Sequence, residues 1–425
     1  MKKNILVIGS GGREHAIVKA LKRSPQIGKL YCSPANAGIV QDAILPDIDP
    51  DKFDEVADFC QAEKIDFVVI GPEQPLVDGI VDYLEGKGIK VFGPNKIAAQ
   101  LEASKDFMKM IVSKYNVPTA AYEAFTDKQK ALDYINKKGA PIVIKADGLA
   151  AGKGVTVAIT MEDALNAVEE AFAGKFGDAG KKLVIEEFLA GEEASYFVIC
   201  DGKNYKEFGY AQDHKRAFDD DKGPNTGGMG TYSPAPIVTD EVRKKTLEKI
   251  IKPTIEGLRA EGIEYKGFLF AGLMIENGEP KLIEYNIRMG DPETQTIFTR
   301  LESDFIEIIE KVIDGNLNQL PEINFSDKYA VCVVMAAKGY PGQYQKGHII
   351  DVSQATKISD VTIYHAGTVL QNGTLKSSGG RVLGVTATGA TIKEARHLAY
   401  NAINIIGFEG GFCRRDIAKK AYKSN

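Results

Sequence analysis

The stretch Pro141–Thr160 reads PIVIKADGLAAGKGVTVAIT and joins two strand-like runs through a glycine-rich loop. The two runs are Pro141–Lys145 and Thr156–Thr160, and both are rich in apolar and β-branched residues. Leu183–Glu187 predicts a further strand. This part of the chain therefore predicts a hairpin within a sheet.

The loop of this hairpin differs from a P-loop at two positions. Three residues instead of four separate Gly148 from Gly152, and Gly154 stands where a Ser or Thr would bind Mg²⁺. A hairpin that closes over phosphates fits the sequence better, with Lys145 reaching a phosphate as a point charge. The alternative is a surface turn flanked by lysines.

Residues 1–103 alternate strand and helix signals, which predicts a doubly wound parallel-sheet domain. Apolar runs at Asn4–Ile8, Phe67–Ile70 and Lys90–Phe92 each end in glycine. Ligands of open parallel sheets bind outside the carboxyl ends of the strands, so these glycines are expected to leave room for one.

The segment Gly9–His15, GSGGREH, is a poor dinucleotide motif. Glu14 occupies the position of the third glycine, and the following strand at Leu30–Ser33 ends without an acidic residue. A phosphate at the start of the next helix and a tight strand-to-helix turn remain equal alternatives.

Polar and glycine-rich sequence extends from Tyr210 to Pro236 and predicts a long irregular segment. Its motifs DHKR, from Asp213 to Arg216, and GPNTGGMG, from Gly223 to Gly230, suit phosphate binding and substrate enclosure. His214 alone indicates no acid–base role. Strands follow, and then one long amphipathic helix whose apolar face carries Ile297, Leu301, Phe305, Ile308, Ile309 and Val312.

The strand Leu282–Met289, LIEYNIRM, carries the strongest chemical signal. Side chains alternate across a strand, so Glu284, Asn286 and Arg288 share one face, and Ile283, Tyr285 and Ile287 share the other. Oxygen ligands suit Mg²⁺, and a fixed guanidinium suits a transferring phosphoryl group. An ordinary amphipathic edge strand is the weaker alternative.

Three shorter motifs each allow a structural and a functional interpretation. In GDPE, Asp291 fits a helix N-cap and Pro292 a first helical residue, with substrate binding also compatible. Glu186 and Glu187 fit either a nucleotide contact or a solvated strand edge. The segment SSGGR, which ends at Arg381, fits an anion contact or a turn.

The remaining sequence predicts a C-terminal α+β unit and excludes several protein classes. Strands at Tyr329–Ala336 and Arg381–Ala387 precede a helix with a capping box at Thr391 and Glu394. A net charge of −5 does not favour nucleic acid, and no apolar run reaches the length of a membrane span. Five separated cysteines without a C-x-x-C pair indicate reduced thiols and a cytoplasmic protein.

Together these motifs resemble the ATP-grasp ligases, and among them the phosphoribosylamine–glycine ligase (glycinamide ribonucleotide synthetase) family. The resemblance covers nearly the whole chain in order, through GSGGREHA, GPEQPL, IKADGLAAGKGV, EEFLAGEEAS, DHKRAFDDDKGPNTGGMG, EYNIRMGDPETQ and SSGGRVLGV. It implies an N-terminal domain at 1–103, a two-lobed ATP-grasp portion at 104–325 with a mobile lobe at about 120–192, and a C-terminal domain at 326–425.

The resemblance also implies an activity, in which ATP joins glycine to 5-phosphoribosylamine through glycyl phosphate, in a cytoplasmic monomer with Mg²⁺ or Mn²⁺. Implied ATP contacts are Lys105, Lys145, Gly152, Lys153, Gly154, Glu186, Glu187, Phe188, Leu189 and Glu193. Implied substrate contacts are Gly9, Gly11, Gly12, Asp213, Lys215, Arg288, Asp291, Glu293 and Arg381. Arg288 and Lys145 are the implied catalytic residues, and Glu284 and Asn286 the implied metal ligands.

Two positions depart from the family pattern. Met289 stands where Phe is expected before GDPE, and Cys413 stands where Tyr is expected before RRDI. Both changes exchange one apolar residue for another, so they affect packing more than activity. Three other functions stay open: another ATP-grasp enzyme such as a biotin-dependent carboxylase subunit, a nicotinamide-dependent dehydrogenase, and a nucleotide-binding regulatory protein without turnover.

Overall fold

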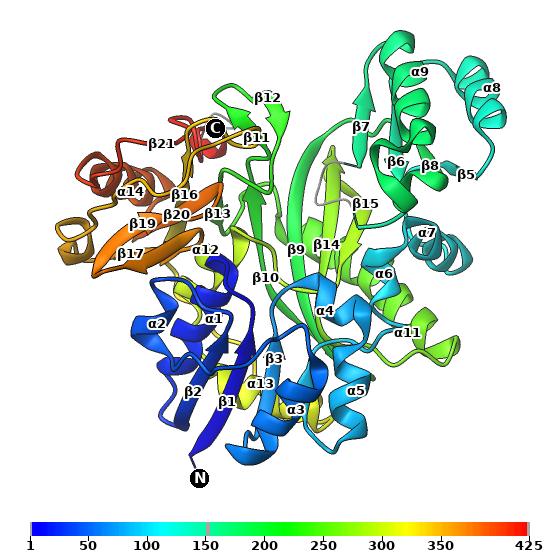
Figure 1. Cartoon of the computed structure of the whole chain (residues 1–425). Helices are drawn as coiled ribbons and strands as arrows, with labels where there is room; N and C mark the ends of the chain where they lie inside the picture. The colour runs from blue at the N-terminus through cyan, green and yellow to red at the C-terminus, as the bar shows by residue number, and fades with distance from the viewer. Residues whose placement is uncertain (1, 150–153, 423–425) are drawn as a thin grey trace.

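The computed structural model describes residues 2–149 and 154–422 and shows three regions around a long central sheet (Figure 1). The first region contains a four-stranded parallel sheet in the order β2-β1-β3-β4. Its strands are β1 (Lys3–Ile8), β2 (Ile27–Ser33), β3 (Phe67–Ile70) and β4 (Val91–Phe92). Its helices are α1 (Gly12–Lys22), α2 (Ile39–Asp42), α3 (Phe53–Ala62), α4 (Glu73–Asp78), α5 (Ile80–Gly86) and α6 (Gln100–Ala103). The predicted doubly wound domain is confirmed.

A separate lobe projects from the molecule at the upper right of Figure 1. Its antiparallel sheet has the order β5-β8-β6-β7, and its apolar side chains form a core of their own. The strands are β5 (Tyr122–Phe125), β6 (Ile142–Ala146), β7 (Val155–Ala158) and β8 (Leu183–Glu187). Helix α7 (Lys105–Lys114) precedes the lobe, which contains α8 (Lys128–Lys138), α9 (Met161–Glu170) and the short turns η1 (Ala171–Lys175) and η2 (Gly177–Lys181). The predicted hairpin is therefore the pair β6–β7.

One nine-stranded sheet runs through the middle and C-terminal parts, with its main path in the order β15-β14-β9-β10-β13-β16-β20-β17. Its strands are β9 (Glu192–Asp201), β10 (Tyr205–Asp213), β13 (Gly230–Ser233), β14 (Lys266–Glu276), β15 (Glu279–Asn286), β16 (Tyr329–Ala337), β17 (Val361–His365), β20 (Arg381–Gly389) and β21 (Gly411–Phe412). Antiparallel pairing of β13 with β16 joins the middle region to the C-terminal region. The strands and helix of the predicted C-terminal α+β unit are confirmed. Its main strands, however, belong to the same sheet as the strands of the middle region.

Helices cover this sheet, and two hairpins extend from it. The helices are α10 (Asp240–Thr246), α11 (Lys252–Ala260), α12 (Glu293–Arg300), α13 (Phe305–Ile313) and α14 (Ile392–Asn404), with short turns η3 (Leu247–Ile251), η4 (Leu317–Gln319), η5 (Ala355–Lys357) and η6 (Lys419–Tyr422). The hairpins are β11 (Arg216–Phe218) with β12 (Lys222–Asn225), and β18 (Thr368–Gln371) with β19 (Thr374–Ser377). The predicted capping box at Thr391 and Glu394 begins α14.

Several sequence expectations about these elements were wrong. The single long helix is two helices, because Leu301 is extended and the Asp304 side chain caps a new helix at the amide of Ile306. The segment from Tyr210 to Pro236 is mostly strand, in β10 to β13. Asp291 is not an N-cap, because its carboxylate accepts a hydrogen bond from Gln295 instead of capping α12.

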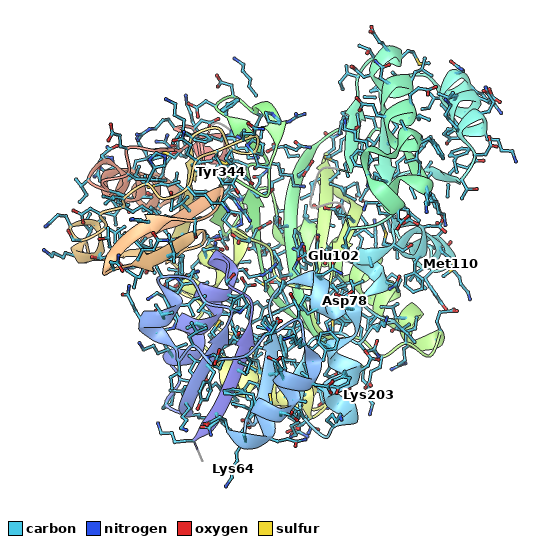
Figure 2. The ribbon with its side chains drawn as sticks, in the orientation of Figure 1. Lys64, Asp78, Glu102, Met110, Lys203 and Tyr344 are labelled. Atoms are coloured by element: carbon cyan, nitrogen blue, oxygen red, sulfur yellow. The ribbon has the colours of Figure 1, made fainter. Side chains whose placement is uncertain are left out.

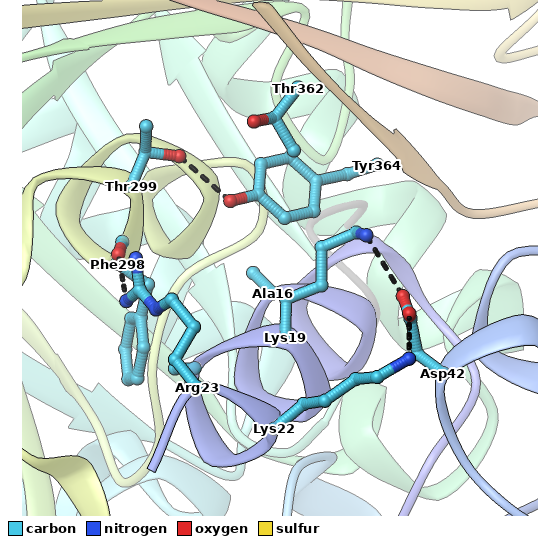
Figure 3. Close-up of a pocket in the computed structure, with 10 residues that line it drawn as sticks. Ala16, Lys19, Lys22, Arg23, Asp42, Phe298, Thr299, Thr362 and Tyr364 are labelled. Atoms are coloured by element: carbon cyan, nitrogen blue, oxygen red, sulfur yellow. Dashed lines mark hydrogen bonds and ion pairs between the residues drawn. The ribbon is translucent and has the colours of Figure 1, made fainter. Parts of the chain in front are cut away.

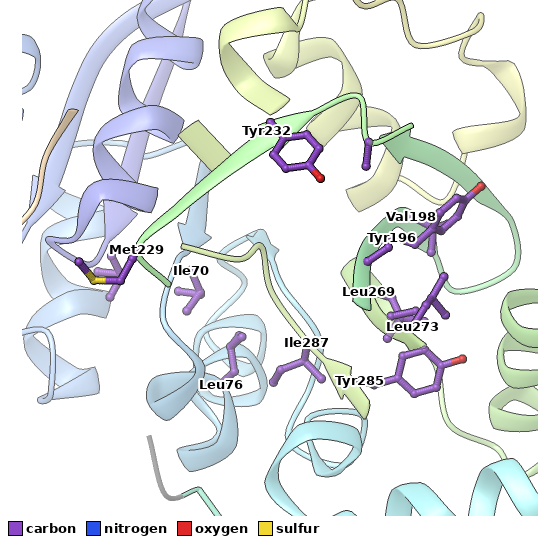
Figure 4. Packing of buried hydrophobic residues seen from close by; sticks show 14 of the residues in the cluster. Ile70, Leu76, Tyr196, Val198, Met229, Tyr232, Leu269, Leu273, Tyr285 and Ile287 are labelled. Atoms are coloured by element: carbon purple, nitrogen blue, oxygen red, sulfur yellow. The ribbon is translucent and has the colours of Figure 1, made fainter. Parts of the chain in front are cut away.

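The apolar face of β15 fixes this strand against the N-terminal region. Tyr285 and Ile287 enter the same core as Leu76 and Ile70 (Figure 4). The expected alternation fails at Ile283, because the register with β14 shifts there and leaves Ile283 half-buried as a bulge. From Glu284 onward the alternation is as predicted.

Candidate active site

The polar face of β15 lies among cations from three other segments of the chain and one from the residues that follow the strand. Burial alone would raise the pKa of Glu284, but nearby positive charges lower it overall. These charges belong to Lys215, Lys145, Lys105 and Arg288. A carboxylate held ionised by converging cations is the arrangement expected where a polyanion and a metal ion bind together.

Glu284 and Asn286 fit a magnesium-type site by their chemistry. In residues 2–149 and 154–422, neither side chain forms an ion pair or hydrogen bond with another side chain, so their oxygens are available. The same residues contain no cluster of three or more His, Cys, Asp or Glu that could hold a metal by itself. A hard cation would therefore take its other ligands from water and phosphate oxygens, as Mg²⁺ usually does.

Lys105 begins α7 and points toward the loop of the glycine-rich hairpin. Its Nζ donates a hydrogen bond to the carbonyl of Gly148 at 3.1 Å, and its amide donates to Oδ1 of Asp147 at 2.6 Å. Burial lowers the pKa of Lys105. Asp147 thus ties the start of α7 to the hairpin and places a cation beside the loop.

Lys145 is buried beside Glu186 and does not extend into open space. Its Nζ lies 2.9 Å from Oε1 of Glu186 and donates a hydrogen bond to the carbonyl of Ile283 at 3.2 Å. Because Oε1 of Glu186 has no well-aligned hydrogen-bond donor among the described residues, the contact is a close ion pair. The bulge at Ile283 therefore has a use, since it presents a carbonyl to Lys145.

Lys109 shares the same carboxylate, and the sequence analysis missed it. Its side chain has no exposed surface, and its Nζ lies 3.3 Å from Oε2 of Glu186. Nζ also donates to Oγ1 of Thr119 at 2.8 Å and to the carbonyl of Ala120 at 3.3 Å. Burial lowers the pKa of Lys109 to about 8.

The segment after β8 presents an exposed aromatic ring near this buried group. Phe188 is 40% exposed, which is unusual for its size, and Leu189 is half-buried. Glu187 is exposed, and its Oε1 accepts a hydrogen bond from the amide of Ala121 at 3.2 Å. Gly154 is buried at the start of β7, whereas Gly152 and Lys153 lie outside the described residues.

A second group of charges lies where β9 begins, β10 ends and α12 begins. Nζ of Lys215 lies 2.5 Å from Oε2 of Glu193, and the Ser195 hydroxyl donates to Oε1 of Glu293 at 2.8 Å. Burial raises the pKa of Asp213 to about 7, with Lys215 opposing the shift and Glu293 adding to it. The cluster offers both carboxylates and a cation to a zwitterionic or amine substrate.

The Gly9–Gly12 turn is occupied by a protein carboxylate. Oε2 of Glu14 accepts the hydrogen bond of the Gly11 amide at 2.6 Å. A Cβ at Gly9 would lie 2.5 Å from the Glu14 side chain, and one at Gly71 would lie 2.2 Å from its Oε1. Gly93 is similarly packed against Leu76. Side chains of this chain therefore take part of the space beside these glycines, and ligand contacts at Gly9, Gly11 and Gly12 stay a prediction.

This packing also argues against a dinucleotide. Glu14 replaces the third glycine of the motif and fills the space at the end of β1 and β3 where a pyrophosphate would approach. Asp291 adds a second carboxylate, since its Oδ2 lies 3.3 Å from the position a Cβ would take at Gly11. Arg13 pairs with Glu14 at 2.6 Å and Arg381 with Asp291 at 3.4 Å, so an arginine balances each of the two acids.

Arg288 lies on the expected face but is held by two acids that the sequence analysis missed. Its Nε donates to Oε2 of Glu73 at 3.1 Å, and its Nη2 donates to Oε1 of Glu102 at 2.7 Å. Glu102 lies near the centre of the molecule in Figure 2. Nη1 donates to the carbonyl of Met289 at 3.4 Å, so Arg288 is a fixed charge with few donors left for a ligand.

Arg381 connects three segments at the edge of the site. Its Nη1 donates to the carbonyls of Gly227 at 2.5 Å and Asp291 at 2.6 Å, and its Nη2 lies 3.4 Å from Oδ2 of Asp291.

His214 is buried, and its Nε2 accepts a hydrogen bond from the amide of Ala418 at 3.3 Å, which agrees with the absence of an assigned acid–base role. Burial lowers its pKa to about 3.

Comparison with known proteins gives one consistent match along the whole chain. Family models match residues 3–102 (phosphoribosylglycinamide synthetase, N domain), 103–294 (ATP-grasp (A) domain of the same synthetase) and 330–420 (its C domain). A phosphoribosylamine–glycine ligase from Mesorhizobium japonicum is 51% identical over 418 residues, which are 98% of each chain.

Solved structures agree. The phosphoribosylamine–glycine ligase of Thermotoga maritima is 34% identical with a TM-score of 0.86, and the match covers 98% of this chain and 100% of that one. The biotin carboxylase domain of Hydrogenobacter thermophilus 2-oxoglutarate carboxylase, solved with MgADP and bicarbonate, is 17% identical with a TM-score of 0.74 over 97% of this chain and 92% of that one. This second match concerns the fold alone.

Proposed function

This chain belongs to the phosphoribosylamine–glycine ligase family of ATP-grasp enzymes, and on that premise we propose which of its residues perform each part of the reaction. The family's reaction uses ATP to join glycine to 5-phosphoribosylamine, with glycinamide ribonucleotide, ADP and phosphate as products. It is the second step of de novo purine synthesis. The roles below are our assignment.

One observation supports the assignment most strongly: the Glu284 carboxylate, with no bonded partner among the described residues, stands among four cations at the junction of the lobe and the central sheet. Glu284 and Asn286 would hold Mg²⁺ or Mn²⁺ together with ATP phosphates. A bound divalent ion would neutralise charge on the phosphates and hold them in line with the attacking carboxylate.

The proposed chemistry has two steps. A glycine carboxylate oxygen attacks the γ-phosphorus of ATP, the bond to the β-phosphate oxygen breaks, and glycyl phosphate and ADP form. The amine of phosphoribosylamine then attacks the acyl carbon, loses a proton, and inorganic phosphate leaves. Positioning and charge neutralisation supply most of the acceleration in such transfers, so no protein nucleophile is required.

On the nucleotide side, we assign Lys105, Lys145 and the hairpin loop, including Gly152, Lys153 and Gly154, to the phosphates. Glu186, Glu187 and the segment Phe188–Leu189 would contact adenine, and Glu193 the ribose. In the structure, Lys145 neutralises Glu186. We propose that ATP draws Lys145 to a phosphate and that Lys109, which stays buried, then carries the charge of Glu186 alone.

Among the residues that we assign to glycine and phosphoribosylamine, carboxylates outnumber cations. Asp213, Glu293 and Asp291 would hold the amino groups of glycine and phosphoribosylamine, while Lys215 would hold a carboxylate or phosphate oxygen. Arg381 and the turn at Gly9, Gly11 and Gly12 would shape the phosphoribosylamine site. Arg288 acts as a fixed positive charge behind the transferring phosphoryl group.

The lobe at about residues 120–192 is the part that we expect to close over ATP. Its core is separate, and its four strands form a sheet apart from the central one. Closure would exclude water from glycyl phosphate, which hydrolyses readily. We propose domain boundaries at residues 103 and 325 and a cytoplasmic monomer. No helix among the described residues is long and apolar enough to cross a membrane.

The test is a complete reaction with ATP, Mg²⁺, glycine and freshly prepared phosphoribosylamine, in which ADP and the amide product are both measured. The two should form in equal amounts, and omission of glycine or of the amine should stop product formation. ADP release that depends on bicarbonate and biotin instead of glycine would identify a carboxylase subunit. Binding of NAD would support the dehydrogenase alternative.

A further inference from the structure

A cavity of about 330 Å³ lies where the N-terminal region, α12 and β17 meet (Figure 3). Its wall includes the C-terminal half of α1, Asp42, the end of α12 at Phe298 and Thr299, and Thr362 and Tyr364 of β17. Junctions between structural units are frequent sites for small ligands, and this volume is at the lower end of their usual range. None of the residues assigned to the reaction above lines this cavity.

The lining is positively charged. Lys19, Lys22 and Arg23 contribute cations, and Asp42 contributes the one carboxylate among the lining residues. Nζ of Lys19 lies 2.9 Å from Oδ2 of Asp42, and Nζ of Lys22 lies 2.8 Å from Oδ1. One acid against three cations leaves two positive charges for a ligand to neutralise, which matches a dianion.

Arg23 adds a fixed guanidinium beside this cavity. Its Nη2 donates to the carbonyls of Phe298 at 3.0 Å and Leu301 at 3.3 Å, which fixes the guanidinium at the end of α12. Among the described residues, Nε and Nη1 have no acceptor within hydrogen-bond distance, and each is a single donor on a different side of the guanidinium. A charged donor of this kind suits an anionic oxygen.

The rest of the lining offers hydroxyl groups to an organic body attached to that phosphate. The Tyr364 and Thr299 hydroxyls lie 2.7 Å apart and hydrogen-bond to each other, and the Thr362 hydroxyl faces the same space (Figure 3). Ala16, Ala20 and Phe298 also line the cavity but are almost completely buried, so they offer little apolar surface. A bare phosphate ion would leave the hydroxyls without a contact.

Two helices connect the cavity with the proposed reaction site. Helix α1 begins at the Gly9–Gly12 turn and α12 begins at Glu293, and both end at the cavity wall. The eleven residues of α1 separate its two ends by about 16 Å, so the sites are distinct. We propose that the cavity binds a small phosphomonoester, with its phosphate between Lys19 and Arg23, and that α1 and α12 transmit its occupancy to the substrate turn.

The binding test uses glucose 6-phosphate, inorganic phosphate and succinate as probes in isothermal titration calorimetry at constant ionic strength. Glucose 6-phosphate should bind wild-type protein, and should bind more tightly than either other dianion. The double variant Lys19→Gln/Arg23→Gln should bind it at least about tenfold more weakly, because charge-assisted hydrogen bonds are lost. Lys64→Gln/Lys87→Gln, which removes the same charge elsewhere in the N-terminal region, should bind as wild type does.

A third variant distinguishes this cavity from the reaction site. Lys105→Gln/Lys215→Gln should retain glucose 6-phosphate binding, and equal melting temperatures should show that each variant is folded. The proposal fails if wild type does not bind at millimolar concentrations, if Lys19→Gln/Arg23→Gln binds normally, if Lys105→Gln/Lys215→Gln loses binding, or if succinate binds equally well. None of these outcomes depends on the ligase assignment, because no turnover is measured.

Hydrogen–deuterium exchange tests the transmission. Glucose 6-phosphate should slow amide exchange at the start of α1 and of α12, in addition to the residues at the cavity. Protection confined to the cavity wall would leave binding intact and contradict transmission.

Discussion

The ammonium group of Lys109 lies 3.3 Å from Oε2 of Glu186, although the Lys109 side chain has no contact with solvent. The other oxygen of the same carboxylate lies 2.9 Å from Nζ of Lys145. One buried acid therefore has two cations, of which Lys145 also reaches the carbonyl of Ile283 beside the metal-ligand strand. Lys145 can therefore move to a phosphate while Lys109 keeps the buried Glu186 carboxylate paired with a positive charge.

Replacement of Lys109 by Met should therefore weaken ATP binding. With one cation left for Glu186, Lys145 is retained in its ion pair and is less available to a phosphate. We expect KM for ATP to rise about tenfold or more, with a smaller change in kcat at saturating ATP. Lys114→Met is the matched control, since Lys114 lies on the same helix but pairs with Glu261 at the surface. Equal KM values in the two variants would contradict the role of Lys109.

The pH dependence of ATP binding provides a second test of the same pair. Burial lowers the pKa of Lys109 to about 8, with Glu186 and Glu187 opposing the shift and Lys145 adding to it. As pH rises through about 8, Lys109 loses the charge that Glu186 requires once Lys145 has moved. ATP affinity of the wild type should decline over this range, whereas Lys109→Met should lack this decline. Calorimetric titrations from pH 7 to pH 9.5 would measure it.

Glu284→Gln should remove metal-dependent turnover while leaving the fold intact. The amide keeps the size of the side chain but loses the charge that would bind a divalent cation. Glycine-dependent ADP formation should fall at least about 100-fold, because metal stabilisation of phosphoryl transfer is worth several kcal/mol. Electron paramagnetic resonance of Mn²⁺ in the presence of ADP should show weaker metal binding. Glu279→Gln, at the exposed start of the same strand, should behave as wild type; normal turnover in Glu284→Gln would reject the metal assignment.

Asp213→Asn should stabilise the protein in a pH-dependent way. The folded protein retains a proton on Asp213 up to about pH 7, whereas the unfolded chain releases it near the ordinary pKa of 3.8. Wild-type stability therefore carries a penalty that grows as pH rises from about 4 to 7 and is constant above that range. Urea unfolding should show Asp213→Asn more stable than wild type at pH 8, with the difference shrinking toward pH 5. An unchanged difference across this range would show that the Asp213 pKa is not raised.

Arg414 connects the C-terminal segment to the hairpin of β11 and β12. Its buried guanidinium donates through Nη2 to Oδ2 of Asp416 at 2.7 Å. Its Nη1 donates to Oδ1 of Asp221 and to the carbonyl of Arg216, both at 2.9 Å. Arg414→Met should lower the free energy of unfolding by roughly 3 kcal/mol, because it leaves the mostly buried Asp416 unpaired. KM for the acceptor substrates should rise more than KM for ATP, since the hairpin adjoins Lys215. Arg415→Met, at the exposed neighbouring position, is the control for both measurements.

Local pattern was enough to predict most elements. β1 and β3 matched because their continuous apolar runs agree with the burial of these strands. The break between α12 and α13 was missed, although Ser303 and Asp304 carry a helix-start signal, because the apolar face continues across the break. The bulge at Ile283 depends on the register with β14, which no pattern within one strand specifies.

The site residues that lie along one strand could be predicted from the sequence. Those that are positioned by packing between distant segments could not. The shared face of Glu284 and Asn286 follows from alternation along β15, and Arg288 continues this face two residues beyond the end of the strand. Lys109 reads as a surface lysine of an amphipathic helix, and its burial follows only from the lobe packing against α7. Glu14 looked like a defect in a glycine motif, and its carboxylate in fact fills the space that the glycines leave.

The origin of the oxygen atoms in the released phosphate tests the central claim most directly, namely that this site uses ATP to phosphorylate the glycine carboxylate. Glycine labelled with ¹⁸O in its carboxylate would be converted with ATP, Mg²⁺ and phosphoribosylamine, and the phosphate analysed by mass spectrometry. One ¹⁸O atom in each phosphate formed is the expected result, because the acyl C–O bond breaks when the amine attacks glycyl phosphate. Product formation with unlabelled phosphate would contradict the acyl phosphate route and the site roles built on it.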